Sequence, residues 1–235
     1  IDGQAIELRS DRNAEDPVGQ FEKIDGQWKE TSAERTTVTR LEKTPGLQGP
    51  IDDAFLSRFI VVLPEGKSSN ESLQRWVDFE IAHFLDRWKA TFRGQPIVVK
   101  GNELTPEQMK SANLILWGDP ESSRAIAKVV DRLPIEWNAS TITVGDSKFD
   151  ATTHAPALIY PNPFAPDRYV VINSGPTFRE QHDKTNSQQN PKLPDWTIFD
   201  LTTPPSGSSA GKVVAADFFD EFWQPKPSPP LSAQK

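Results

Sequence analysis

The pentapeptide Gly207-Ser208-Ser209-Ala210-Gly211 matches the G-x-S-x-G pattern that carries the nucleophile of many serine hydrolases. In an α/β-hydrolase this serine lies on a sharp turn between a strand and a helix, and the histidine base follows it in the chain. Here the pentapeptide lies in a loop rich in proline, serine and glycine, and His83, His154 and His182 all precede it. We therefore interpret the match as coincidental and assign no catalytic residue.

Metal and cofactor sites are not predicted either. The three histidines are far apart in the sequence, without the H-x-H or H-x-x-x-H spacing of paired ligands. The chain contains no cysteine, which excludes disulfides, thiolate nucleophiles and cysteine-ligated metals. It also contains no glycine-rich phosphate loop.

Polar residues that follow the predicted strands are better candidates for a binding site. They are Glu65, Lys67, Asp119, Ser122, Asn173, Ser174 and Thr177. The carboxyl ends of parallel strands are the usual position of ligands, and helix N-termini beside them favour anions. The same residues can instead be structural, since Asp119 is a good helix cap and Asn173 to Gly175 is a turn sequence. Both a ligand crevice and structural capping stay open.

The elements that would position these residues are five short apolar runs and one long amphipathic segment. The runs are 59–64, 97–101, 113–118, 157–161 and 169–175. Apolar residues at three- and four-residue steps predict a helix from Ser69 to about Phe92. Near-continuous β-branched runs alternating with helices indicate a parallel sheet that is buried on both faces. We expect an α/β fold of three layers, a mostly parallel Rossmann-like or flavodoxin-like sheet with helices on both faces.

Further elements are expected around this framework. Short helices are predicted to begin at Thr105-Pro106 and Asp119-Pro120, and a third is predicted at 177–189. Short strands are predicted at 135–137 and 141–144, and an edge hairpin is predicted from 196–201 and 213–217.

The domain organisation follows from composition. Residues 1–46 are expected to form a small β-rich element, the end of an upstream module, with strands at 5–8, 20–24, 27–29 and 36–41 and a hairpin turn at Asp25-Gly26. The turn-rich segment 44–50 marks the boundary to an α/β domain at 47–223. The tail, 224–235, is rich in proline and serine and is expected to be disordered.

Charge and hydropathy limit the partners. The net charge of -7 argues against nucleic-acid binding, which needs clustered Lys and Arg. The longest apolar run is about six residues, far below the roughly 20 that a membrane helix needs, so no membrane insertion is expected. Because the chain opens at Ile1 without Met, we expect a fragment or processed form of a longer protein.

Six phrases together resemble a known family. They are Leu47–Phe55, Asn113–Pro120, Leu133–Trp137, Leu158–Pro163, Tyr169–Gly175 and Lys192–Trp196. Across about residues 1–223 the chain resembles the C-terminal region of bacterial prolyl-oligopeptidase-like proteins, which carry an α/β-hydrolase domain. The resemblance implies that a serine peptidase or esterase nucleophile lies upstream of Ile1, in a hydrolase domain of the same polypeptide. It also implies a secreted or periplasmic protein.

These observations lead to one expected function with two alternatives. We expect a non-catalytic accessory C-terminal α/β domain that packs on the upstream hydrolase domain or positions a small polar ligand. The alternatives are an independent hydrolase, and a small-molecule or glycan-binding domain with its crevice at the carboxyl ends of the strands.

Overall fold

The computed structural model describes residues 1–6, 20–31, 41–182 and 184–227, and divides the chain into two compact units, Ile1–Arg40 and Leu41–Lys235. In the first unit, β1 (Gln20–Ile24) and β2 (Gln27–Thr31) form an antiparallel hairpin. Asp25 and Gly26 both have positive φ, at 51° and 78°, as the predicted two-residue turn requires. The strands predicted at 5–8 and 36–41 lie largely outside the described residues, as does most of the tail at 224–235.

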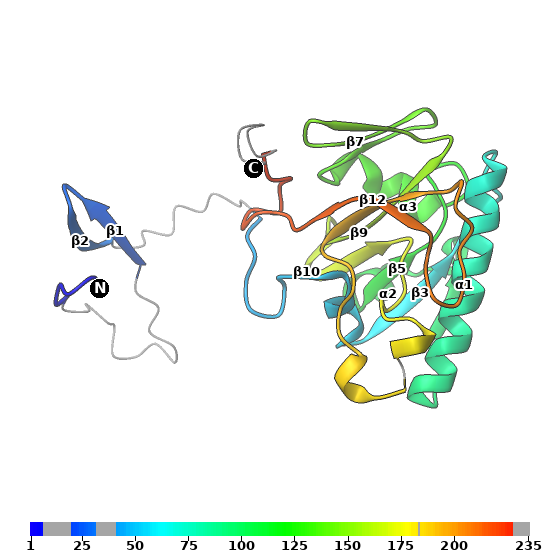
Figure 1. Cartoon of the computed structure of the whole chain (residues 1–235), viewed down its shortest axis with the longest axis horizontal. Coiled ribbons are helices and arrows are strands. Elements are labelled where there is room, and N and C mark those ends of the chain that lie inside the picture. Colours follow the sequence, from blue (N-terminus) through cyan, green and yellow to red (C-terminus); the bar gives the residue numbers. More distant parts are fainter. Residues whose placement is uncertain (7–19, 32–40, 183, 228–235) are drawn as a thin grey trace. The chain divides into compact units, whose positions relative to one another are not determined.

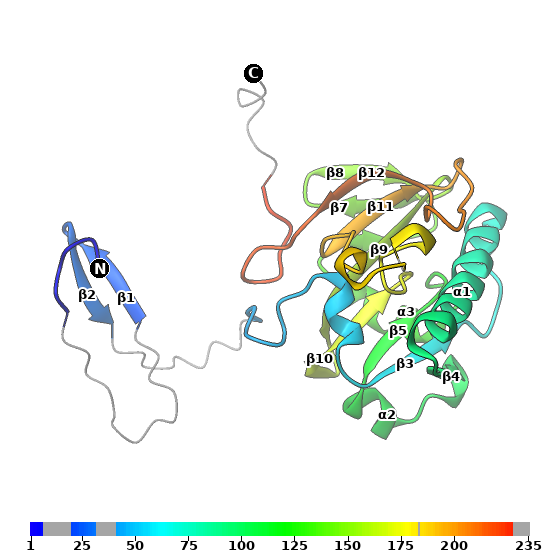
Figure 2. The same ribbon diagram turned by 60° about the horizontal axis from the view of Figure 1, so that its bottom comes forward.

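The second unit is built on a seven-stranded mixed sheet (Figure 1). Its strands are β3 (Phe59–Leu63), β4 (Ile97–Lys100), β5 (Asn113–Leu116), β9 (His154–Asn162), β10 (Ala165–Ile172), β11 (Trp196–Asp200) and β12 (Lys212–Asp217). Their order is β12-β11-β9-β10-β5-β3-β4, which Figure 2 shows from β11 to β4. The four strands β10, β5, β3 and β4 are parallel, whereas β9 is antiparallel to both of its neighbours and β12 is antiparallel to β11.

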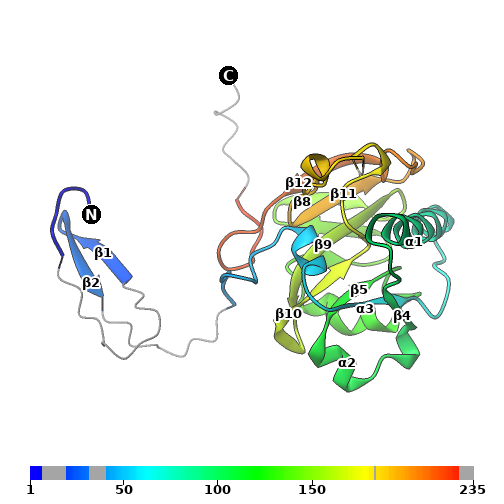
Figure 3. The same cartoon turned by 90° about the horizontal axis from the view of Figure 1, so that it is seen from below.

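One long helix packs against a face of this sheet. Helix α1 (Glu71–Phe92) begins after Asn70, whose side chain accepts hydrogen bonds from two backbone N–H groups of the first turn. The Asn70 side chain thereby provides a hydrogen-bond acceptor for backbone N–H groups that would otherwise lack a partner. The rings of Trp76 and Phe84 lie 5.5 Å and 6.3 Å from those of Phe199 and Trp117. The predicted amphipathic helix is therefore confirmed, and Figure 3 shows it nearly along its axis.

The prediction of a three-layer, Rossmann-like sheet with helices on both faces is wrong. Helices α2 (Pro106–Ser111) and α3 (Arg124–Val129) have six residues each, and with α1 they are the only α-helices of the described residues. Two such short helices do not form a helical layer. A small antiparallel sheet of β6 (Glu136–Trp137), β7 (Thr141–Val144) and β8 (Ser147–Asp150) contributes buried side chains to the same core. Figure 2 shows it near β12.

Connection length explains why the sheet is mixed. Only two residues, Pro163 and Phe164, separate β9 from β10, whereas a parallel pair needs a crossover of about a dozen residues. The hairpin predicted from 196–201 and 213–217 is present as β11 and β12, with β12 at the edge. The helix predicted at 177–189 is replaced, in its described residues, by two 3₁₀ turns, η4 (Glu180–His182) and η5 (Asn186–Gln188). Helix α3 begins after Ser123 rather than at Asp119.

The division between the two compact units lies between Arg40 and Leu41, so residues 41–46 belong to the second unit. Lys43 binds the α/β unit, because its Nζ lies 2.5 Å from Asp195 Oδ2 and 3.1 Å from the Phe219 carbonyl oxygen. Nζ also lies 4.8 Å from the centre of the Trp223 ring. Phe219 and Trp223 are buried and belong to the core.

Three further 3₁₀ turns complete the described elements, η1 (Ile51–Phe55), η2 (Gly101–Glu103) and η3 (Val130–Arg132). Among the residues that the structure describes, no helix combines the length and the apolar composition that crossing a bilayer requires.

Candidate functional site

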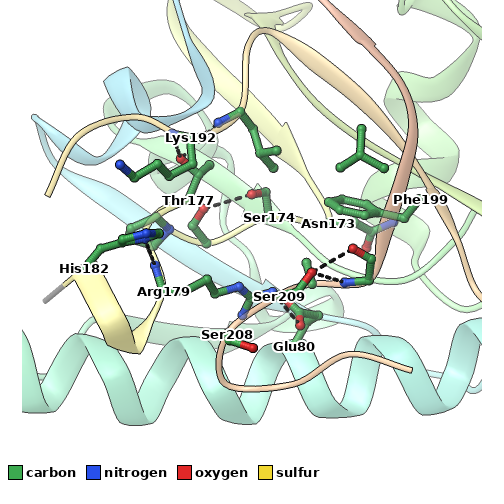
Figure 4. A pocket seen from close by; sticks show the side chains of 16 residues that line it. Glu80, Asn173, Ser174, Thr177, Arg179, His182, Lys192, Phe199, Ser208 and Ser209 are labelled. Carbon is green, nitrogen blue, oxygen red and sulfur yellow. Dashed lines mark hydrogen bonds and ion pairs between the residues drawn. The ribbon is translucent and has the colours of Figure 1, made fainter. Parts of the chain in front are cut away.

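A pocket of about 190 Å³ lies beyond the carboxyl ends of β10 and β11 and beside the start of β12 (Figure 4). We call it the strand-end pocket. It is lined by Glu80, Asn173, Ser174, Gly175, Pro176, Thr177, Arg179, His182, Lys192, Leu193, Phe199, Ser208, Ser209, Ala210, Gly211 and Val213. Glu80 comes from α1, residues 173–182 follow β10, and residues 208–211 come from the β11–β12 loop. Strands β10 and β11 both run antiparallel to β9, so their carboxyl ends point the same way.

A buried ion pair forms one wall of the pocket. Arg179 Nη2 donates to both carboxylate oxygens of Glu80, at 2.9 and 2.8 Å, and only 10% and 8% of the two side chains is exposed. Burial raises the pKa of Glu80, although the charge and hydrogen bonds of Arg179 act in the opposite direction. Glu80 is the only carboxylate in the described lining, and the positive charge of Arg179 offsets its negative charge.

The same guanidinium reaches a histidine of α1. Arg179 Nη1 lies 2.7 Å from His83 Nδ1, which must accept this hydrogen bond because a guanidinium only donates. Burial lowers the pKa of His83, and the positive charge of Arg179 lowers it further. A neutral His83 therefore matches the hydrogen bond that the structure contains.

Thr177 lines the pocket and hydrogen-bonds to two other segments of the chain, one containing Asp52 and one containing Lys192. Its hydroxyl donates a short hydrogen bond to the Asp52 carboxylate, and its backbone N–H donates to Asp52 Oδ1 at 3.0 Å. The hydroxyl oxygen accepts a hydrogen bond from the backbone N–H of Lys192 at 2.7 Å. Burial raises the pKa of Asp52, while the hydrogen bonds from Thr177 act to lower it. Thr177 thus has a structural role in holding the chain that carries Lys192.

Two of the three serine hydroxyls that line the pocket donate to backbone carbonyls, and the third, Ser208 Oγ, lies 3.1 Å from Ser206 Oγ. Ser174 Oγ donates to the Gly175 carbonyl oxygen at 2.9 Å, and Ser209 Oγ donates to the Gly211 carbonyl oxygen at 2.7 Å. The segment 207–211 connects β11 to β12 and is not a strand-to-helix turn. It therefore lacks the context of a nucleophile elbow.

The positive charge of Lys192 is not neutralised within the described residues. Lys192 is exposed, and its Nζ forms no ion pair with a carboxylate of the part of the chain that the structure describes. His182 lines the same pocket, and its Nδ1 accepts a hydrogen bond from the backbone N–H of Arg179 at 3.3 Å. With Glu80 and Arg179 paired, Lys192 gives the pocket a net positive charge, which favours an anion.

The seven predicted crevice residues separate into three groups. Asn173, Ser174 and Thr177 line the strand-end pocket, whereas Asp119 lines a second cavity, described below. The remaining three, Glu65, Lys67 and Ser122, line neither.

Several of these residues have the capping role that the sequence also allowed. Glu65 Oε2 accepts from the Arg124 N–H at the start of α3, at 3.0 Å, and Asp119 Oδ1 accepts from the Ser122 N–H at 2.7 Å. The Asn173 amide binds the backbone of Gly118, with Oδ1 accepting at 2.9 Å and Nδ2 donating at 2.8 Å. Asn173 therefore connects the ends of β10 and β5.

Sequence reasoning did not single out Glu80, Arg179 or Lys192. A signal existed for Glu80, because it lies between Val77 and Phe84 on the apolar face of α1. A carboxylate in such a stripe is rarely buried without a partner. Nothing in the sequence indicated that Arg179 is this partner, or that residues 208–211 reach the same pocket.

No group of three or more His, Asp or Glu residues within the described ranges could hold a metal ion. Comparisons of the chain with models of protein families, with curated proteins and with solved structures found no match.

Proposed function

We propose that this chain is a non-catalytic accessory α/β domain of a larger secreted hydrolase- or peptidase-like protein, and that it holds a small anionic ligand in the strand-end pocket. The observation that carries the ligand class is the charge of the lining, where Glu80 is paired with Arg179 and Lys192 is not paired with a described carboxylate. The resemblance to prolyl-oligopeptidase-like proteins supports the accessory role, because it assigns the hydrolase domain to the upstream polypeptide.

The size and lining of the pocket limit the ligand. Its volume of about 190 Å³ is below the roughly 300–1,000 Å³ of pockets for drug-sized molecules. Phe199, Leu193 and Val213 give the pocket an apolar part of its lining. A small carboxylate with an apolar portion, of the size of an amino acid or a dicarboxylic acid, fits both properties.

Binding of butyrate, followed by NMR of the ¹⁵N-labelled chain, tests this ligand class. Lys192→Met is expected to weaken binding at least about tenfold, because it removes a charge-assisted hydrogen bond donor. Lys184→Met is the matched control, since Lys184 is an exposed lysine of the same loop that does not line the pocket. Equal affinity in the two variants, or no binding to the native chain, would contradict the proposal.

An independent hydrolase is the second candidate, and one observation favours it. Ser209, His182 and Glu80 all line the same pocket, so a hydroxyl, an imidazole and a carboxylate share one space. Their present hydrogen bonds are to other groups, and the Ser209 proton is directed to a backbone carbonyl. A rearrangement would be required before Ser209 could act as a nucleophile.

Assays with p-nitrophenyl acetate and with a prolyl peptide substrate distinguish the two candidates. The accessory proposal expects no turnover by this chain, and turnover by the longer protein that contains it. Turnover by this chain that disappears in Ser209→Ala, with an unchanged circular dichroism spectrum, would establish the hydrolase instead. Thr203→Ala, a hydroxyl deletion in the same loop outside the lining, is the matched control.

A further inference from the structure

A second cavity, of about 310 Å³, lies at the point where the order of the parallel strands reverses. The chain leaves β3 through α1 to β4 on one side, and then returns through α2 to β5 on the other side of β3. In open α/β sheets the crevice outside the carboxyl ends of two such strands is the usual ligand site. We call this space the switch-point cavity.

The cavity is built from segments that follow these strands and from the small sheet. Ser69 and Asn70 follow β3, whereas Asp119, Pro120 and Glu121 follow β5. Leu73 belongs to α1, and Trp137, Asn138, Ala139 and Ala151 come from the β6–β8 region. It shares no lining residue with the strand-end pocket.

Two carboxylates in the cavity are held in place by neighbouring residues. Asp119 is buried, and its Oδ1 accepts from the N–H and the hydroxyl of Ser122, each at 2.7 Å. The hydroxyl of Ser68 donates a short hydrogen bond to Asp119 Oδ2. Glu121 Oε2 accepts from Ser69 N and Ser69 Oγ, at 3.2 and 2.5 Å, and no described residue donates to Oε1. Both carboxylates therefore retain lone pairs for hydroxyl groups of a ligand.

Donors and an aromatic side chain accompany these acceptors. Asn138 Oδ1 accepts from Ser140 N and Thr141 N, at 2.9 and 3.0 Å, which fixes the amide and leaves Nδ2 without a described partner. Trp137 is 9% exposed and lines the cavity. Together with Leu73, Trp137 adds apolar surface to a polar lining.

The charges of the lining exclude some ligand classes. No Lys, Arg or His is among the described residues that line this cavity, so it is unfavourable for an anion. Two carboxylates provide too few ligands for the six to eight oxygens that Ca²⁺ takes. Carboxylate acceptors, an amide donor and an aromatic ring together suit a molecule with several hydroxyl groups and an apolar face.

We propose that the switch-point cavity binds a neutral sugar, with the hydroxyls donating to Asp119 and Glu121 and the pyranose ring contacting Trp137. The ligand class is independent of the function proposed for the strand-end pocket. The two sites differ in charge, because the first binds through Lys192 and the second through carboxylates.

The test uses the ¹⁵N-labelled chain with maltose, cellobiose and N,N′-diacetylchitobiose as probes, followed by NMR. At least one disaccharide is expected to shift resonances of residues at 119–121 and 137–139. Asp119→Asn and Glu121→Ala should each weaken that binding at least about tenfold. Glu107→Ala is the matched control, because Glu107 is an exposed carboxylate of α2 that lies outside the cavity.

Three results would overturn the proposal. They are no binding of any of the three disaccharides to a folded native chain, binding that Glu121→Ala leaves unchanged, and resonance shifts confined to other regions. Calcium chloride is titrated in parallel, and saturable binding of Ca²⁺ that requires Glu121, without sugar binding, would assign a cation site instead. Glu121 is exposed, so its substitution tests the site even if Asp119→Asn perturbs the fold.

Discussion

Arg179 holds both carboxylate oxygens of Glu80, at 2.9 and 2.8 Å, and so connects the segment after β10 to the middle of α1. This pair closes one wall of the strand-end pocket and removes the negative charge that Glu80 would otherwise place there. The pair therefore affects both the stability of the domain and the ligand class of the pocket.

Arg179→Met is expected to destabilise the domain by about 3–5 kcal/mol, because it leaves the Glu80 carboxylate buried without its partner. The loss should be smaller near pH 5 than near pH 8, since protonated Glu80 avoids the cost of burying a charge. Urea unfolding at both pH values measures this. The double variant Arg179→Met/Glu80→Gln should recover part of the loss, and no recovery would show that the guanidinium acts mainly through other contacts.

The pKa of His83 is below its usual value near 6.5, which makes stability depend on pH. As the pH falls through 6.5 towards the lower folded-state pKa, the unfolded chain binds a proton that the folded chain does not bind. Neutral His83 therefore contributes to the free energy of unfolding above pH 6.5, and this contribution is lost on acidification. The free energy of unfolding of the native chain, minus that of His83→Gln, should decrease from about pH 8 to about pH 5.5. A difference that is constant over this range would contradict the lowered pKa.

Two lysines in ion pairs should differ strongly in their effects. Lys43→Met leaves Asp195, whose side chain is 0% exposed, without its 2.5 Å partner, and is expected to cost about 3–5 kcal/mol. Lys226→Met breaks a pair with Asp217 whose side chains are 44% and 48% exposed, and should cost about 0–1 kcal/mol. Chemical denaturation of both variants tests whether residues 41–46 belong to the α/β unit. Similar small effects would mean that Lys43 contributes little to that unit.

Asn173→Ala is expected to loosen the connection between the ends of β10 and β5. It leaves the N–H and carbonyl of Gly118 without their side-chain partner, at about 1–3 kcal/mol for each buried group. The φ of Asn173 is 52°, and alanine is unfavourable there by about 1–2 kcal/mol. Asn173→Gly removes the same hydrogen bonds but tolerates this backbone conformation. The midpoint temperature of thermal unfolding should therefore be highest for the native chain, lower for the glycine variant and lowest for the alanine variant. Equal midpoints for the two variants would exclude a backbone effect.

Local sequence signals predicted most elements but not their assembly. The apolar stripe of α1, the Asp25-Gly26 hairpin and the cap at Thr105 are each encoded within a few residues, and the structure contains all three. The direction of β9 was missed because an apolar run looks alike in parallel and antiparallel strands. The short Pro163-Phe164 connection was the signal that could have resolved it.

In the candidate site, too, local signals identified some residues and missed others. Asn173, Ser174 and Thr177 were predicted because they follow a strand, and they line the strand-end pocket. Lys192, Ser208 and Ser209 were not predicted there. The backbone N–H of Lys192 is held by the Thr177 hydroxyl, and the connection between β11 and β12 brings Ser208 and Ser209 to the pocket.

By itself, the sequence determined where the strands and the long helix form, since hydrophobic periodicity and caps act over a few residues. It also excluded disulfides and cysteine-ligated metals, because the chain has no cysteine. Only the tertiary structure decided that Glu80 meets Arg179, that the G-x-S-x-G loop lies beside His182, and that Asp119 shares a cavity with Trp137. Those contacts join residues remote in the chain, and sheet order and packing, rather than local propensity, bring them together.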